Sequence, residues 1–239
     1  MQPGLIRSTR KALVIGGTGT VGSAVLRELA GRGVPAAFTF HSHEDRARVL
    51  ASELGLTAFA VDLADPVALR QALDARDVPD VVICCAGITA SPPLVELDPA
   101  AWQRAMAVNV GGPLEVCRWI AQHASKTRVV DVVIVGGLDR TQSLALPVGY
   151  AATQGALSAM VMALGHELGP VGVRINMVSL GVLEGGTSRD LQPQRLRDYE
   201  KYSSLRRVGT AAEAAKAIAW LALENTYIQG KVVPVNGGI

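Results

Sequence analysis

A phenol and an amide are spaced one helical turn apart in the second half of the chain. Tyr150 is followed four positions later by Gln154, and residues i and i+4 lie on the same face of a helix. A phenol can give a proton to a developing oxyanion, but its pKa stays near ~10 unless a cation lies beside it. Gln154 carries no charge, so the sequence predicts a candidate acid, Tyr150, without an activator.

A glycine-rich turn lies near the N-terminus, between a predicted strand over 12–15 and a predicted helix over 23–32. Glycines allow a tight turn and the close approach of a pyrophosphate, and a helix N-terminus offers unpaired N–H groups. Because strand, turn and helix follow in this order, we expect a dinucleotide site rather than a purely structural turn. The expected contacts come from Gly16, Thr18, Gly19, Thr20, Val21 and Gly22.

The ends of the next two predicted strands should face the adenosine half of such a ligand. After the second strand come His41, Ser42 and nearby Arg46, with no acid until Glu44. A carboxylate there would bind the ribose of NAD, whereas imidazole, hydroxyl and guanidinium groups suit the 2′-phosphate of NADP. We therefore favour NADP(H) over NAD(H), with a solvated polar loop as the alternative.

The third predicted strand ends at Asp62 and Leu63. The carboxylate of Asp62 could reach the adenine amino group, or it could be only a turn residue at a strand end. Leu63 would line the same part of the site.

Apolar runs and amphipathic stretches alternate along the whole chain. Strands are predicted over 12–15, 36–40, 57–61, 81–85, 129–135, 174–178 and 231–235, and helices over 23–32, 44–54, 66–75, 99–125, 150–168 and 211–223. This rhythm predicts an α/β fold with one doubly wound, Rossmann-type parallel sheet of about seven strands and helices on both faces. No linker or repeat interrupts it, so residues 1–239 are expected to form a single domain. Residues 181–202 form the one long irregular stretch, a candidate lid.

Composition narrows the class of protein further. The 239 residues carry a net charge of +2, too small to indicate a nucleic acid or an anionic membrane as partner. The N-terminal residues 1–10 contain no apolar core of signal-peptide length, and no run approaches the length of a spanning helix. Cys84, Cys85 and Cys117 are expected to be buried free thiols in the cytoplasm, with neither a disulfide nor a metal site.

Several further segments resemble the short-chain dehydrogenase/reductase family, over nearly the whole chain. Cys85-Ala86-Gly87 is similar to the family's Asn-Ala-Gly, Arg174-Ile175-Asn176 to its Arg-x-Asn, and Leu180-Gly181 to its Pro-Gly. Asn109 lies where the family has an Asn in a helix, and Asn236-Gly237-Gly238 resembles its C-terminal Asp-Gly-Gly. The resemblance is greatest to β-ketoacyl-[acyl-carrier-protein] reductases and polyketide-type ketoreductases.

The resemblance implies roles for these residues and exposes two departures. In the family a Tyr protonates the carbonyl, a Lys four residues later lowers its pKa, a Ser thirteen residues before it binds the substrate oxygen, and an Asn holds the Lys. Tyr150 and Asn109 match this pattern. Gly137 replaces the serine and Gln154 replaces the lysine.

The resemblance also implies cofactor contacts from Ala86, Gly87 and Gly181. Gln154 could still bind the ribose, so cofactor binding could survive these departures, although it is not assured. Gly185 lies where the family often has a nicotinamide-binding Thr, and Glu184 precedes it.

Replacement groups for the missing serine and lysine are few. Ser143 or Arg140, near Asp139, could reach the substrate oxygen through a shifted loop, although exposed loop positions are the simpler interpretation. His166 and Glu167 lie farther along the helix of Tyr150 and are expected at the surface.

Three functions therefore remain open. The first is an NADP(H)-dependent reductase of a ketoacyl thioester or similar carbonyl, free or bound to an acyl-carrier protein, with a weakened centre. The second is a catalytically inactive subunit that pairs with an active ketoreductase paralogue. The third is a non-redox dehydratase, isomerase or cyclase that uses the same cleft. The resemblance implies homo- or hetero-oligomers, dimers or tetramers, formed through helices 99–125 and 150–168.

Overall fold

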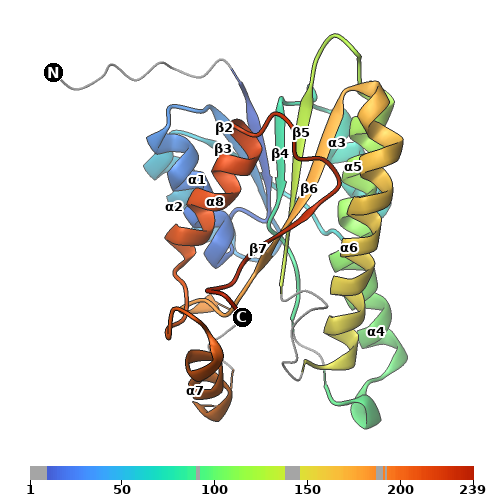
Figure 1. Ribbon diagram of the computed structural model, residues 1–239. Coiled ribbons are helices and arrows are strands. Elements are labelled where there is room, and N and C mark those ends of the chain that lie inside the picture. The colour runs from blue at the N-terminus through green and yellow to red at the C-terminus, as the bar shows by residue number, and fades with distance from the viewer. Residues whose placement is uncertain (1–9, 90–91, 138–145, 187–190, 192) are drawn as a thin grey trace, which may run out of the picture.

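A computed structural model describes residues 10–89, 92–137, 146–186, 191 and 193–239. Its centre is one parallel sheet of seven strands in the order β3-β2-β1-β4-β5-β6-β7 (Figure 1). The strands are β1 (Ala12–Ile15), β2 (Ala36–Phe40), β3 (Thr57–Ala60), β4 (Val81–Cys84), β5 (Val130–Gly136), β6 (Val173–Leu180) and β7 (Val232–Val235). The order reverses between β1 and β4, which confirms the predicted doubly wound sheet.

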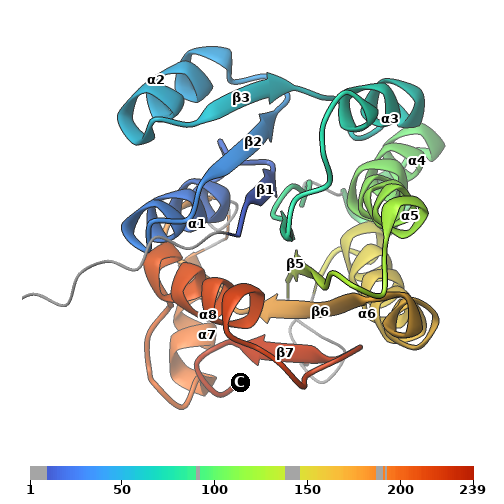
Figure 2. The same ribbon diagram turned by 90° about the horizontal axis from the view of Figure 1, so that it is seen from above.

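Helices cover both faces of this sheet (Figure 2). On one face α1 (Thr20–Gly31) packs beside α2 (Glu44–Leu54) and α8 (Ala211–Leu223). On the other lie α3 (Pro66–Asp74), α4 (Pro99–Met106), α5 (Gly112–His123) and α6 (Val148–Leu168). Two apolar cores result, one on each side of the sheet. Phe38 contributes to the α1 side and Trp119 to the α5 side, and both side chains are fully buried.

Capping groups explain where two helices begin. The carboxylate of Asp65 accepts hydrogen bonds from the N–H groups of Val67 and Ala68 at the start of α3, as the sequence predicts. At the start of α8, Thr210 and Glu213 form a reciprocal capping box. Both caps satisfy N–H groups that have no partner within the helix.

Two predicted elements differ from the structure in kind, whereas the others differ from it at most in their bounds. The single helix predicted over 99–125 is divided by a π-helical turn, Ala107–Gly111, which contains Asn109. The stretch 181–202, predicted to be irregular, contains α7 (Pro193–Tyr202). Its apolar residues are too few to show a helical period, so the pattern missed it.

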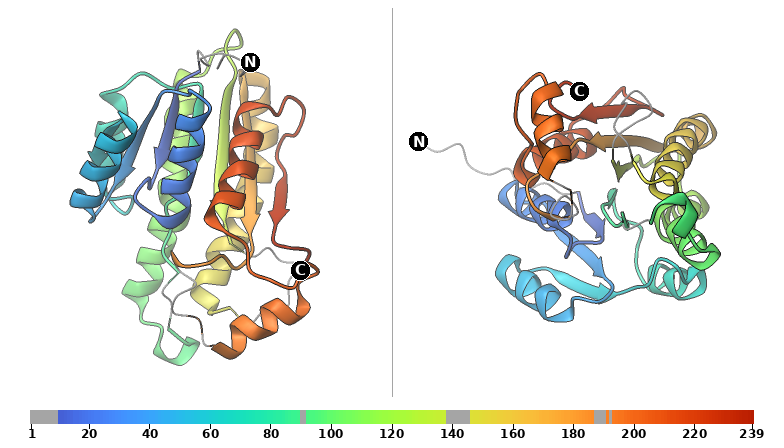
Figure 3. Two further views of the ribbon diagram at one scale, coloured as in Figure 1. Left: turned by 90° about the vertical axis from the view of Figure 1, so that its left-hand side faces the viewer. Right: turned by 90° about the horizontal axis from the view of Figure 1, so that it is seen from below.

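The end of α7 is attached to the C-terminal segment (Figure 3). The buried phenol of Tyr199 donates a hydrogen bond of 2.6 Å to the carbonyl oxygen of Asn236. Ser204 donates to the carbonyl oxygen of Gly238 at 2.8 Å. These bonds fix α7 and the residues directly after it to the segment that follows β7.

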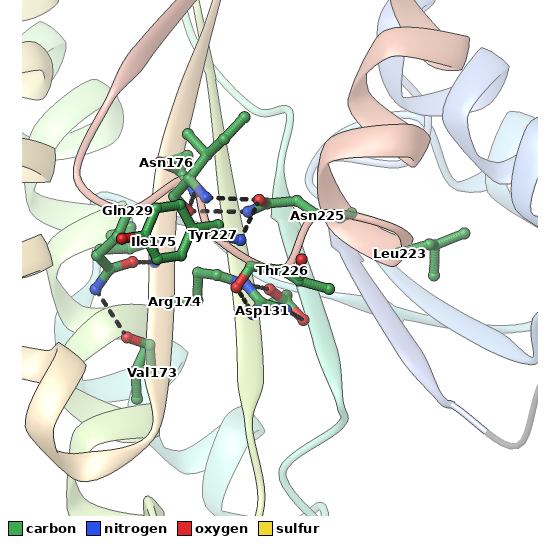
Figure 4. A network of polar contacts seen from close by, with 12 residues as sticks. Asp131, Val173, Arg174, Ile175, Asn176, Leu223, Asn225, Thr226, Tyr227 and Gln229 are labelled. Carbon is green, nitrogen blue, oxygen red and sulfur yellow. Dashed lines mark hydrogen bonds and ion pairs between the residues drawn. The ribbon is translucent and has the colours of Figure 1, made fainter.

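A polar network joins the amino ends of β5 and β6 to the loop after α8 (Figure 4). The carboxylate of Asp131 is buried and pairs with Arg174 through two hydrogen bonds, of 2.6 and 3.0 Å, and with Arg10. Asn176 donates to the carbonyl oxygen of Ile228 at 2.8 Å. Arg174 and Asn176 therefore hold this loop to the sheet, at the end away from Tyr150.

The three cysteines are free thiols. Cys84 and Cys117 are buried as predicted, whereas Cys85 is partly exposed, a correction. Cys84 and Cys85 pack into the cores on opposite faces of the sheet, as neighbouring strand residues should. Over the described residues no helix combines the length and apolarity needed to cross a bilayer, and no three metal-ligating side chains cluster.

Candidate active site

A cleft of about 530 Å³ runs along the carboxyl ends of the strands, where open α/β sheets bind ligands. It is formed by the turn after β1, the ends of β2 to β6 and the first half of α6. The predicted site residues that line it are Gly16, Thr18, Gly19, Thr20, Val21, His41, Ser42, Asp62, Leu63, Ala86, Gly87, Asn109, Gly137, Tyr150, Gln154 and Gly181. Gly22 lies just inside the cleft wall, in the first turn of α1.

The glycine turn has no room for side chains at its key positions. Gly16 has a φ of +83°, and an added Cβ would lie 2.6 Å from the Cβ of Ala86. A Cβ on Gly22 would lie 2.2 Å from the carbonyl oxygen of Gly16. Thr39 supports the turn by accepting the N–H of Gly16 at 2.9 Å. Helix α1 begins at Thr20, so its first N–H groups point into the cleft without helical partners, as phosphate binding requires.

The end of the cleft near β2 and β3, called the adenosine end after the prediction from the sequence, carries four polar side chains: His41, Ser42, Arg46 and Asp62. His41, Ser42 and Arg46 are exposed and extend from the end of β2 and the start of α2. Asp62 accepts the N–H of Ala64 at 2.9 Å, and this bond is the main cause that holds the pKa of its carboxyl below the ordinary value. Asp62 therefore closes the turn at the strand end through Oδ1 and also lines the cleft, so both positions that the sequence allowed for it are occupied at once.

Asn109 lies in the π-helical turn and is buried. Its amide exchanges two hydrogen bonds of 2.8 Å with the backbone of Ile88 and donates a third, of 3.1 Å, to the hydroxyl of Thr153. Thr153 in turn donates to the carbonyl oxygen of Tyr150 at 2.8 Å. Asn109 therefore fixes the loop after β4 against the helix that carries Tyr150.

Gln154 is buried and directed at the end of β5. Its side-chain carbonyl accepts the N–H of Gly137 at 2.7 Å, and its amide donates to Thr153 at 3.2 Å. A neutral amide with both ends bonded occupies the position that the resemblance assigns to a lysine. It supplies hydrogen bonds to the protein and no charge to the phenol.

The phenol of Tyr150 fills the space beside Gly137. A Cβ built on Gly137 would lie 2.0 Å from the hydroxyl oxygen of Tyr150. Burial raises the pKa of Tyr150 to about 12, opposite to the lowering that an adjacent cation would produce. Tyr150 is therefore a neutral acid over the whole physiological range.

Comparison with known sequences shows the family of the chain. The sequence model of a family described as "Enoyl-(Acyl carrier protein) reductase" matches residues 17–239, which is most of the chain. The protein is a short-chain dehydrogenase/reductase.

Individual known proteins are similar to this chain over nearly their whole length. The 3-oxoacyl-[acyl-carrier-protein] reductase MabA of Mycobacterium tuberculosis is 25% identical over 236 residues, which cover 97% of this chain and 93% of MabA. The structure of BdcA in complex with NADPH has a TM-score of 0.88 and 26% identity and covers 97% of this chain and 95% of that one. A blue fluorescent protein from a metagenomic library, in complex with NADPH, has a TM-score of 0.87 and 28% identity and covers 97% and 98%.

The remaining predicted residues of this short-chain dehydrogenase/reductase lie as follows. Gly181 lines the cleft and leaves no space for a Cβ, which would lie 1.9 Å from the phenol oxygen of Tyr199. Gly185 lines the cleft with a φ of +73°, whereas Glu184 is exposed. His166 and Glu167 are exposed on α6, as predicted. Asp139, Arg140 and Ser143 lie outside the described residues.

Sequence reasoning missed three residues that shape the site. Thr39 caps the glycine turn, Ser179 donates to the carbonyl oxygen of Gly137 at 2.6 Å, and Arg104 lines the adenosine end. Thr39 lies inside a predicted strand and Ser179 directly after another, and a small polar residue at such a position is too common a signal to single either of them out. Arg104 shows no sequence signal, because its place depends on how α4 packs beside the end of β3.

Proposed function

We propose that this protein binds NADP(H) and slowly reduces a ketoacyl thioester or a related carbonyl, with Tyr150 as a neutral acid. The observation that carries the proposal is that one cleft contains both a glycine turn shaped for a pyrophosphate and the phenol of Tyr150. The substrate class is supported by the similarity to MabA, which is named a 3-oxoacyl-[acyl-carrier-protein] reductase. The cofactor is supported by the similar structures in complex with NADPH.

The residues of the cleft fit a dinucleotide phosphate. An added Cβ at Gly16 or Gly22 would clash with Ala86 or with the backbone of Gly16, so only glycine permits this tight turn, and the N–H groups at the start of α1 face the cleft beside it. His41, Ser42 and Arg46 offer donors to a 2′-phosphate. A bound nicotinamide would supply the hydride, which is the chemistry of the cofactor itself.

The chain's own contribution to the reaction is weakened in two ways. Tyr150 must give its proton without a neighbouring cation, and positioned acid–base catalysis is typically worth ~10²–10⁴ in rate. Gly137 offers no hydroxyl to the substrate oxygen, and a missing oxyanion donor costs roughly 10²–10³ in known cases. These losses are not additive, so a measurable rate is expected from binding and orientation alone.

The test combines binding with turnover. Calorimetric titration with NADPH and NADH should show tighter binding of NADPH. Oxidation of NADPH should then depend on added acetoacetyl-CoA and fall further in Tyr150→Phe, which would exclude a contaminating host reductase as the source. Binding of NADPH without substrate-dependent oxidation of NADPH would contradict the proposed reductase activity. Product formation without any nicotinamide would instead favour the non-redox chemistry.

A second candidate is a non-catalytic subunit that pairs with an active ketoreductase paralogue. It is favoured by Gln154, whose side-chain oxygen and nitrogen are both hydrogen-bonded to the protein itself. Trp102, Leu114 and Met162 are large apolar residues that are partly exposed on α4, α5 and α6, the helices through which pairing would occur. Copurification with a reductase of intact Ser/Tyr/Lys pattern would support this function. A stable homomeric particle that turns over NADPH alone would argue against it.

A further inference from the structure

A carboxylate and two basic side chains converge at the adenosine end of the cleft. One oxygen of Asp62, Oδ1, accepts the N–H of Ala64. The other, Oδ2, lies 3.5 Å from Nε2 of His41 and 3.6 Å from Nη2 of Arg104. All three side chains line the cleft, and the side chain of Arg104 is 49% exposed.

The sheet order decides which part of a dinucleotide this cluster meets. The pyrophosphate belongs at the turn after β1 and the adenosine ribose at the end of β2. Asp62 follows β3, the strand beyond β2, so it lies past the ribose. Arg104 approaches the same point from the last turn of α4. The base of the adenosine is the part of the ligand that would reach this point.

The contacts within the cluster leave capacity for a ligand. Both distances to Oδ2 exceed the usual 2.7–3.2 Å of an N–H···O hydrogen bond, so Oδ2 keeps an acceptor site free. A guanidinium has five N–H donors, and the contact with Asp62 uses Nη2 alone. An acceptor and a donor therefore stand side by side on the cleft wall.

We propose that Arg104 is a specificity-determining residue that reads the base of the cofactor together with Asp62. Adenine presents an amino donor beside a ring-nitrogen acceptor. Asp62 Oδ2 accepts from the amino group and Arg104 donates to the ring nitrogen, so the pair matches this edge. The inference rests on the proposed binding of NADP(H) and adds to it a residue on α4 that selects the base.

The test uses two reduced dinucleotides that differ only in the base. One is NADPH and the other is its hypoxanthine analogue, in which an oxygen replaces the amino group. Calorimetry compares the wild type with Arg104→Gln, Arg104→Lys and the control Arg27→Gln. Arg27 is a matched control because it also forms an exposed ion pair, with Glu53 at 3.1 Å, but lies outside the cleft.

The wild type should bind NADPH about 10-fold more tightly than the analogue, because Asp62 would face an oxygen there. Arg104→Gln should weaken NADPH binding about 5- to 50-fold, while Arg27→Gln should leave it unchanged. Arg104→Lys should also weaken NADPH binding, because an ammonium lacks the planar fork of N–H donors with which a guanidinium can contact Asp62 and the base at the same time.

Two results would overturn the inference and leave the proposed function standing. One is binding of NADPH by Arg104→Gln as tightly as by Arg27→Gln. The other is full retention of NADPH affinity in Arg104→Lys, which would show that only the positive charge matters. A wild type that binds neither dinucleotide would overturn the proposed function, and the inference with it.

Discussion

The side-chain carbonyl of Gln154 accepts the backbone N–H of Gly137 at 2.7 Å, so the two positions that depart from the family pattern are in direct contact. The neighbouring Gly136 belongs to the same unit. A Cβ there would lie 2.8 Å from Oε1 of Gln154 and 2.1 Å from Cε of Met177. The missing serine and the missing lysine are therefore parts of one packed arrangement, and changing one residue alone should not rebuild the complete catalytic centre.

Replacing Gly137 by serine is the simplest attempt at repair, and we expect it to fail. The new Cβ would fall 2.0 Å from the hydroxyl of Tyr150, so the phenol must move away from the place where it gives its proton. Overpacking of this kind costs typically about 1–3 kcal/mol. Urea unfolding should show this loss for Gly137→Ser, and the rate of NADPH oxidation with acetoacetyl-CoA should not rise. The double variant Gly137→Ser/Tyr150→Phe should recover part of the stability, since it lacks the clashing oxygen. A single Gly137→Ser variant that is both stable and faster would contradict this account.

Replacing Gln154 by lysine should restore part of the missing activation. An ammonium near Tyr150 should lower its pKa from about 12, and we expect the reduction rate to rise at least about 10-fold, within the range of positioned acid–base catalysis. Stability should fall by about 1–3 kcal/mol, because the N–H of Gly137 loses its acceptor. Gln154→Met is the matched control, of similar length and without charge. Ultraviolet titration of the tyrosinate and steady-state rates measure both effects, and equal rates in the two variants would show that charge is not what the site lacks.

The pKa of Tyr150 also predicts how stability depends on pH. In the unfolded chain this phenol titrates near ~10, and in the folded protein near about 12, so the folded state holds the proton more tightly. The contribution of this phenol to the free energy of unfolding is fully present below pH ~10 and is lost as the pH rises to about 12. The loss is about 2–3 kcal/mol at most. Burial raises the pKa of Cys85 and Cys117 to about 12 as well, so only a comparison with Tyr150→Phe isolates this effect. Urea unfolding across this window should show a shallower decline in Tyr150→Phe than in the wild type. Parallel declines would mean that the phenol titrates normally.

Two glycines in helix α1 provide a paired test of the nucleotide site. Gly22→Ala places a Cβ 2.2 Å from the backbone oxygen of Gly16, which cannot yield as a side chain would. We expect loss of NADPH binding and a lower melting temperature. Gly31→Ala meets nothing within 4 Å, and alanine favours a helix over glycine by up to ~1 kcal/mol, so this control should bind NADPH normally and be slightly more stable. Normal binding by Gly22→Ala would mean that the turn does not hold the pyrophosphate.

The polar network at the far end of the sheet should affect stability without affecting the cleft. Asp131→Asn leaves Arg174 and Arg10 facing a neutral amide in a buried place, and breaking such a pair typically costs about 3–5 kcal/mol. NADPH affinity should not change, because Asp131 lies at the amino end of β5 and the cleft at its carboxyl end. Guanidinium unfolding and calorimetry give the two readouts. Arg174→Gln should lower the free energy of unfolding less in the Asp131→Asn variant than in the wild type. Strictly additive losses of stability would show that the two residues act separately.

Local patterns were sufficient for most of the fold. The bounds predicted for β2, α2 and α8 agree with the structure, because apolar periodicity, caps and glycines are properties of neighbouring residues. The interruption of the helix at Asn109 and the existence of α7 were not predicted. A π-helical turn leaves no local signature, and α7 is polar except for the side that holds Tyr199.

For the site, the sequence by itself determined which chemical groups are present: a glycine turn, the phenol of Tyr150, and neither serine nor lysine at the expected spacing. Only the tertiary structure decided what these groups do to one another. It places the phenol over Gly137, bonds Gln154 to the end of β5, and brings Arg104 to Asp62, which lies 42 positions earlier in the chain. These relations depend on the packing of α4 and α6 against the strand ends. Burial, which raises the pKa of Tyr150, is a property of the folded chain and not of the residue.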